Sequence, residues 1–254
     1  MKRPNVCLTK EYLLFRTASA GDYINTLDLL NFGVDPGAMG NAAIKGACRA
    51  GRKRIIELLW DRGADPYQCS LSNLHLHLDG PAIRGAVAYD CLHERLEIVP
   101  LLLHRKACPP FPLQAALLML ERGNKSWAQK GLGEYMIDTS AKYYPAADLL
   151  PGLPGPWVPY LVQHFKVDPN RLFPNSSGGQ QTALARAVDY MDVSAMKGLL
   201  DCGADPNAVP FDHPYLVDPD NAQSPELAWE MLRLLANAKG SSWELPVDKL
   251  AEII

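Results

Sequence analysis

Short apolar stretches recur along the chain at helical spacing, and several of them end in the same way. The apolar residues of segments 55–59 and 193–200 fall on one stripe of a helix. Gly63 and Gly203 follow these stripes, and glycine readily adopts the left-handed conformation that closes a helix. Asp-Pro comes next in both copies and predicts an extended turn that leads away from the helix.

The same ending can be laid over other parts of the chain, so the pattern is a repeat. A helix of small residues precedes it at 42–48 and at 182–188, and small side chains let two helices approach closely. The predicted unit is therefore a short helix, a tight turn, a second helix and a turn-rich finger. Copies of the ending occupy segments 29–36, 58–66, 102–109 and 199–207, with a weaker copy at 161–170.

This unit resembles the ankyrin repeat, which consists of two antiparallel helices and a β-turn finger over about 33 residues. The best matches are 182–207 and 41–66, and Gly21 and Gly51 stand where the family has a glycine between its two helices. The copies are irregular, because Lys106 and other residues replace glycine at some helix ends and the spacing varies.

The resemblance implies an all-α, ankyrin-like helical repeat solenoid with short β-turn fingers, built as a single array over 1–254. Segments 124–156, 175–181 and 207–224 are rich in proline, glycine or polar residues and predict irregular or loop structure. The approximate units are 10–36, 40–66, 81–109, 111–138, 139–170 and 181–207, followed by a C-terminal loop and helical cap over 208–254.

Charge and composition narrow the function. The net charge is −3, which gives no general reason to expect nucleic-acid binding. There is no signal-peptide pattern and no apolar stretch of about 20 residues that could span a membrane. Six cysteines occur without a C-x-x-C pair, so we expect neither a disulfide framework nor a zinc site. These observations predict an intracellular protein, cytoplasmic or nuclear, without a cofactor and without membrane contact.

Ankyrin proteins bind other proteins with their fingers and with the exposed face of their first helices. The resemblance therefore implies an adaptor or scaffold whose concave face and finger loops bind a partner protein. Recurrent arginines on that face would favour a partner with an acidic surface, although an ordinary solvated helix surface is the simpler explanation for them. The residues that fall on the expected binding face are Arg16, Arg49, Arg84, Tyr89, Arg186, Asp189 and Tyr190.

Chemical sites have weaker support, and we expect a binding protein rather than an enzyme. His75, His77 and Asp79 alternate as metal ligands on one side of a strand would, but a finger with its leucines turned inward explains the pattern better. No nucleophile elbow and no phosphate-binding glycine loop occurs. The alternative function is an unusual enzyme or small-molecule-binding protein, with a pocket near Trp127 or Trp157 in the irregular repeats 111–170.

Overall fold

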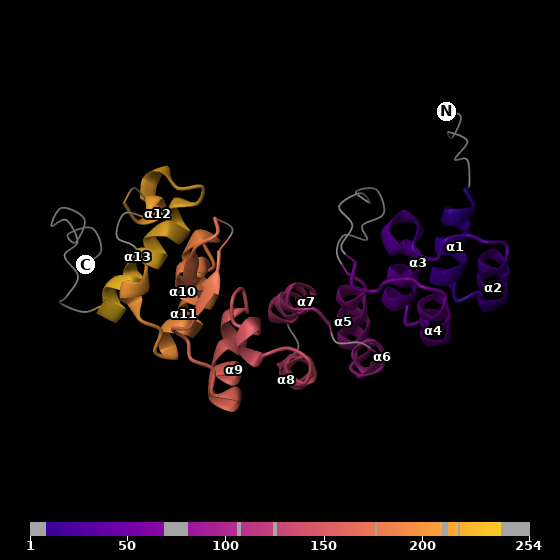
Figure 1. Cartoon of the computed structure of the whole chain (residues 1–254), viewed down its shortest axis with the longest axis horizontal. Helices are drawn as coiled ribbons and strands as arrows, with labels where there is room; N and C mark the ends of the chain where they lie inside the picture. Colours follow the sequence, from indigo (N-terminus) through magenta and orange to yellow (C-terminus); the bar gives the residue numbers. More distant parts are fainter. Residues whose placement is uncertain are drawn as a thin grey trace. The chain divides into compact units, whose positions relative to one another are not determined.

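The computed structural model describes residues 9–68, 81–105, 108–123, 126–175, 177–209, 213–217 and 219–239. These residues fold mainly into helices, which confirms the all-α fold expected from the sequence. They form two compact units, unit 1 from Met1 to Tyr143 and unit 2 from Tyr144 to Ile254, which Figure 1 colours along the sequence. The prediction that residues 1–254 stack as a single array stays a prediction.

Unit 1 is built of helix pairs, each with a first and a second helix. The pairs are α1 (Lys10–Ala20) with α2 (Tyr23–Asn31), α3 (Ala38–Arg49) with α4 (Lys53–Asp61), α5 (Ala82–His93) with α6 (Ile98–Arg105), and α7 (Pro110–Arg122) with α8 (Ser126–Ala141). The first helices α1, α3, α5 and α7 pack against one another in that order, and α2 packs against α4 as α6 does against α8 (Figure 1). This stacking of helix pairs is the predicted ankyrin-like arrangement.

Small residues let the first helices approach one another. A Cβ atom on Gly46 of α3 would collide with the side chains of Ser19 and Phe15 of α1. A Cβ atom on Gly85 of α5 would lie 3.2 Å from the backbone nitrogen of Arg49. The core that these helices enclose is apolar, with residues such as Ile44, Ile56 and Leu102 fully buried. Close packing of repeat against repeat is the main source of stability in such arrays, because one pair alone cannot bury its apolar face.

The first helices α1, α3 and α5, and the first helix of the pair in unit 2 (Ala183–Asp189), each end in a left-handed residue, whereas Gly123 after α7 has a φ of −84°. Gly21 and Gly51 have φ values of +90° and +66°, as the sequence predicted. Glu94 and Met191 adopt the same conformation with φ values of +55° and +53°, although they are not glycine. In each case the following amide donates to a carbonyl five residues back, for example from Arg95 to Asp90 at 3.1 Å. The same backbone turn therefore forms even where another residue replaces the glycine.

The endings of the second helices and the fingers also repeat. Gly33, Gly63 and Gly203 are left-handed and end α2, α4 and the second helix of the last pair, which confirms the predicted helix stops. The aspartate of each following Asp-Pro accepts a hydrogen bond from the amide two residues on, for example from Tyr67 to Asp65 at 2.9 Å. A neighbouring finger is tied in by an asparagine, because the Asn41 side chain accepts from the Asp65 amide at 2.7 Å.

Unit 2 contains one well-formed helix pair and several shorter elements. The pair is α10 (Ala183–Asp189) with α11 (Val193–Asp201). Thr182 caps α10 and Asp192 caps α11 through their side chains. The other elements are η1 (Ala146–Leu149), η2 (Gly155–Trp157), α9 (Val158–Phe165), β1 (Leu172–Pro174), β2 (Gln180–Thr182), η3 (Pro206–Ala208), α12 (Pro214–Val217), η4 (Pro219–Asn221) and α13 (Pro225–Lys239).

The finger at 172–182 is an antiparallel hairpin in which Leu172 pairs with Thr182, and its turn lies in the loop expected at 175–181. The structure departs from the expected loops in two places. α8 is a regular helix where the sequence predicted irregular structure from 124, and it continues past the expected unit boundary at 138. The expected loop 207–224 contains the short helices α12 and η4. Local propensity misjudged these segments, because packing against neighbouring helices decides their conformation.

Within the part of the chain that the structure describes, no helix combines the length and the apolar character needed to cross a membrane.

Candidate partner-binding surface

The arginines that the sequence placed on the first helices of unit 1 lie in different surroundings. Arg16 and Arg49 are exposed on α1 and α3. Arg84 is half-buried on α5, where its Nε atom lies 3.3 Å from the Sδ atom of Met119 on α7. Its guanidinium is thus engaged by the next repeat, and Arg16 and Arg49 are the better exposed pair.

These arginines do not occupy one column along the array. Arg16 and Arg186 each lie five residues before the left-handed residue that ends their helix, whereas Arg49 lies two residues before it and Arg84 ten. Because a helix turns by 100° per residue, Arg16 and Arg49 point within about 60° of each other, whereas Arg84 points about 140° away from Arg16. The first helices of unit 1 therefore do not present all three guanidinium groups as the single stripe that a simple alignment of repeats suggests.

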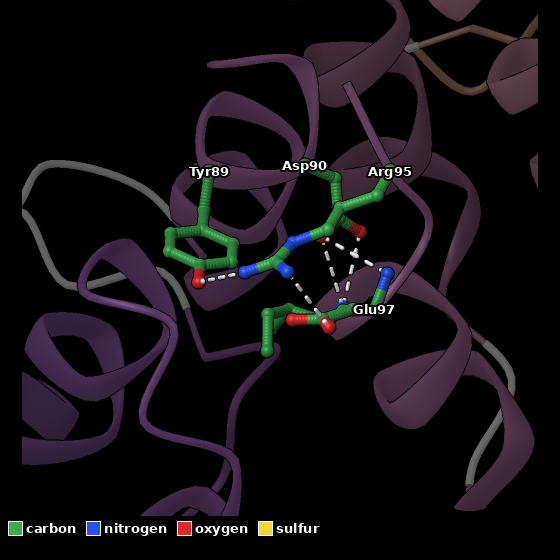
Figure 2. Close-up of polar contacts among 5 residues, drawn as sticks. Tyr89, Asp90, Arg95 and Glu97 are labelled. Carbon is green, nitrogen blue, oxygen red and sulfur yellow. Dashed lines mark hydrogen bonds and ion pairs between the residues drawn. The ribbon is translucent and has the colours of Figure 1, made fainter. Parts of the chain in front are cut away.

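Tyr89 lies in a polar network at the turn between α5 and α6, which we call the α5–α6 corner (residues 89–97). Figure 2 shows the Arg95 side chain between Tyr89 and Glu97. The Arg95 guanidinium donates to the Tyr89 hydroxyl at 3.0 Å and lies 3.4 Å from the Glu97 carboxylate. The hydrogen bond that Arg95 donates to Tyr89 and the charge of Glu97 raise the pKa of Arg95. The network holds two charged side chains in place at the surface.

The buried carboxylate of Asp90 fixes the backbone of the same corner. It accepts hydrogen bonds from the amides of Glu97, Ile98 and Val99 at 2.8–3.1 Å, which are the first amides of α6 (Figure 2). Burial raises the pKa of Asp90, and the three amide hydrogen bonds oppose that shift. The first amides of a helix lack partners within it, so Asp90 caps α6 from the preceding helix.

Large apolar side chains are exposed at this corner. All five residues from Leu92 to Leu96 are exposed, with Leu92 at 71% and Leu96 at 46%. The ring of His93 lies against that of Tyr89, with centroids 4.3 Å apart. Exposed leucines on a backbone fixed by Asp90 and Arg95 form a rigid apolar surface with charged neighbours.

The predicted residues of unit 2 come together at the end of α10. The Arg186 guanidinium lies 5.4 Å from the ring centre of Tyr190, and Tyr190 is 71% exposed. The carboxylate of Asp189 lies 3.0 Å from Nε2 of His213, which comes from the segment before α12. Asp189 thus has a partner within its own unit, whereas Tyr190 presents a ring to solvent over a stacked cation.

The remaining predicted sites receive little support. His75, His77 and Asp79 lie outside the described residues. Among the residues that are described, no group of three or more histidine, cysteine, aspartate or glutamate side chains is placed to hold a metal ion. The histidines, aspartates and glutamates described between 111 and 170 are all half-buried or exposed, whereas Trp157 is buried. No convergent buried acid or base therefore accompanies Trp157, and the Trp127 side chain lies outside the described set.

Sequence reasoning missed Leu92, Arg95 and Leu96. The family has a glycine between its two helices, and Glu94 stands at that position, so the end of α5 could not be read from the sequence. The available signal was the pair of leucines beside charged residues in Cys91-Leu92-His93-Glu94-Arg95-Leu96, which do not fit a buried stripe.

Comparison with known proteins adds little to this geometry. No family model matches the sequence. No curated protein matches it either. Among solved structures, the fold is similar to the crystal structure of the human ASB11 ankyrin repeat domain, with 15% sequence identity and a TM-score of 0.44 over 89% of this chain and 97% of that chain.

Proposed function

We propose that the chain is a protein-interaction module, an adaptor or scaffold that binds a partner protein with the exposed surface of its first helices. The partner would carry an acidic surface, because Arg16, Arg49 and Arg186 lie on this surface with exposed or half-buried side chains. Membrane contact forms no part of the proposal. An intracellular location, cytoplasmic or nuclear, stays a prediction that cell fractionation checks.

One observation carries the proposal: exposed tyrosine and arginine side chains are held in fixed positions on a tightly packed helical scaffold. Tyr190 is the clearest case, with 71% of its surface exposed and Arg186 stacked on its ring. Tyrosine and arginine dominate the binding energy of protein interfaces, and side chains that are already ordered lose little entropy on binding.

Affinity purification from the native cell extract, read by mass spectrometry, tests the proposal. The wild type is compared with R16E/R49E in unit 1 and with R186E/Y190A in unit 2. R62E/K142E is the matched control for the first variant, because it makes the same charge change at two exposed positions of unit 1 that lie outside the first helices. Circular dichroism checks that each variant is folded.

We expect a protein that the wild type and R62E/K142E retain and that at least one of the other two variants loses. Retention of no protein, or equal retention by all variants, would contradict a role in protein binding.

A further inference from the structure

A second surface lies at the helix-to-helix turns of unit 1, away from the fingers. The turn between α3 and α4 carries the exposed side chains Arg52, Lys53 and Arg54 in succession. Arg52 donates weakly to the carbonyl of Ser19 at 3.4 Å, so this turn also lies against the end of α1. Three adjacent cations on a single turn form the densest basic cluster among the described residues of unit 1.

Gly51 joins this cluster to the α5–α6 corner. A Cβ atom on Gly51 would collide with the ring of Tyr89, so the ring covers the turn that Arg52 and Lys53 follow. The hydroxyl of the same ring accepts the hydrogen bond from Arg95 at 3.0 Å. Arg52 and Lys53 on one turn and Arg95 on the next therefore belong to one continuous surface, with Tyr89 between them.

The surface combines positive charge with apolar anchors. The basic side chains Arg52, Lys53 and Arg95 outnumber the glutamates of the corner, Glu94 and Glu97, and Glu97 already faces Arg95. Arg54 is not counted, because its guanidinium lies 5.2 Å from the ring centre of Tyr23 on α2. Leu92 and Leu96 add the exposed apolar area described above.

We infer that this surface, the α5–α6 corner with the α3–α4 turn, is a docking site for an acidic segment of a partner protein that also carries large apolar side chains. The inference rests on the proposed function, and it names a site outside the face of the first helices. The carboxylates of the segment would face Arg52, Lys53 and Arg95. Its apolar side chains would cover Leu92 and Leu96, whose burial supplies affinity that charge alone does not.

The docking surface is ordered before binding. The Asp90 cap and the Tyr89–Arg95 hydrogen bond hold the corner, so little entropy is lost when the segment binds.

Selection from a displayed library of random 16-residue peptides, with the full chain as bait, tests the inference. Affinities of the selected peptides are then measured by fluorescence polarisation for the wild type and for L92S/L96S and R52E/K53E. The matched controls are I24S/F32S, which replaces two large apolar side chains of unit 1 that are 70% and 81% exposed, and K10E/R62E, which makes the same charge change elsewhere.

We expect selected peptides that are rich in glutamate or aspartate and in leucine-sized side chains. L92S/L96S and R52E/K53E should each weaken their binding by about tenfold or more, as is typical of anchor residues. Binding to the two controls should change less than about twofold, as expected for exposed positions outside an interface.

Three outcomes would overturn the inference: no peptide is selected, the selected peptides are not acidic, or the controls weaken binding as much as the test variants. If R16E/R49E is the only variant that loses binding of the selected peptides, the proposed function stays intact and the peptides bind to the first helices instead. If no peptide is selected and the affinity purification also retains no protein, the proposed function fails as well.

Two further measurements on the same proteins test for other occupants of the surface. Sedimentation of the wild type and of L92S/L96S reports whether a second copy of the chain uses the corner. A single-stranded oligonucleotide that binds the wild type more tightly than any selected peptide, and is lost in R52E/K53E, would assign the surface to nucleic acid. Either result would overturn the inference.

Discussion

The α3–α4 turn and the α5–α6 corner have the same backbone turn but are built from different residues. At α3–α4 the left-handed residue is Gly51, and the Arg52 side chain makes no capping hydrogen bond to the helix that follows. At α5–α6 the left-handed residue is Glu94, and the buried carboxylate of Asp90 caps the second helix.

The difference has a consequence at the surface. Gly51 has no side chain, and its turn lies under the Tyr89 ring. Glu94 projects a side chain instead, and the residues around it, including Leu92 and Leu96, stay exposed. A repeat can thus keep its backbone turn after it loses the glycine that favours the left-handed conformation. The residues that replace it can contact a partner, provided that another group caps the following helix. At the corner Asp90 is that group.

Removing the Asp90 cap should have the largest effect on stability of the changes that test this comparison. D90A leaves the first amides of α6 without their acceptor, and we expect the free energy of unfolding to fall by about 2–3 kcal/mol. D90N keeps one acceptor oxygen and should cost about 1 kcal/mol. Urea denaturation followed by circular dichroism measures both. Equal stability of D90A and the wild type would show that the cap does not secure the corner.

Gly51 should be the next most sensitive position. G51A combines a left-handed backbone with a collision against the Tyr89 ring, and we expect a loss of about 2 kcal/mol. Gly63 is the matched control: its φ is +101° and no atom lies within 4 Å of its Cβ position, so G63A should cost only about 1 kcal/mol of backbone strain. If the two variants are equally destabilised in urea, the Tyr89 ring does not pack on the turn.

Replacing Glu94 with glycine restores the residue that the repeat pattern has at this turn. E94G relieves the left-handed backbone of a residue with a Cβ atom, and we expect a gain of about 0.5–1 kcal/mol in the free energy of unfolding. M191G should give a similar gain in unit 2, where Met191 has the same conformation. E94A, which keeps the Cβ atom, should give none. A loss of stability in E94G would mean that the Glu94 side chain itself holds the corner.

The smallest effect is a dependence on pH. Burial raises the folded-state pKa of Asp90 above its ordinary value of 3.8, so the folded chain holds the proton more tightly than the unfolded chain does. The stability that this difference contributes is complete below the ordinary pKa, and it is lost as the pH rises through the raised pKa. The free energy of unfolding of the wild type relative to D90N should therefore decrease from acid toward neutral pH. A difference that stays constant or increases would contradict burial as the dominant cause.

Much of the fold could be predicted from the sequence, because helix stops and fingers use residues with strong local preferences. Gly33, Gly63 and Gly203 end helices where glycine predicted it, and α4 and α11 lie where the apolar stripes placed them. The regular helix α8 was missed, since tertiary packing decides such segments.

The candidate surface was less predictable. Tyr89 was identified, but its partner Arg95 was not, because Glu94 stands where the repeat pattern has glycine and hides the end of α5. The role of Asp90 depends on a carboxylate of α5 reaching three amides seven to nine residues ahead, which no local pattern encodes. The arginines of the first helices were identified by residue type, whereas their differing directions follow only from the observed helix ends.

Site-specific photo-crosslinking in cells tests most directly whether the α5–α6 corner is a docking site. A photo-reactive amino acid replaces Leu92 in one protein. In the control it replaces Phe32, which is 81% exposed at the C-terminal end of α2. We predict a discrete crosslinked product with another protein from position 92 that is absent from position 32 and is reduced by R52E/K53E. No product at position 92, or the same product from both positions, would contradict the account.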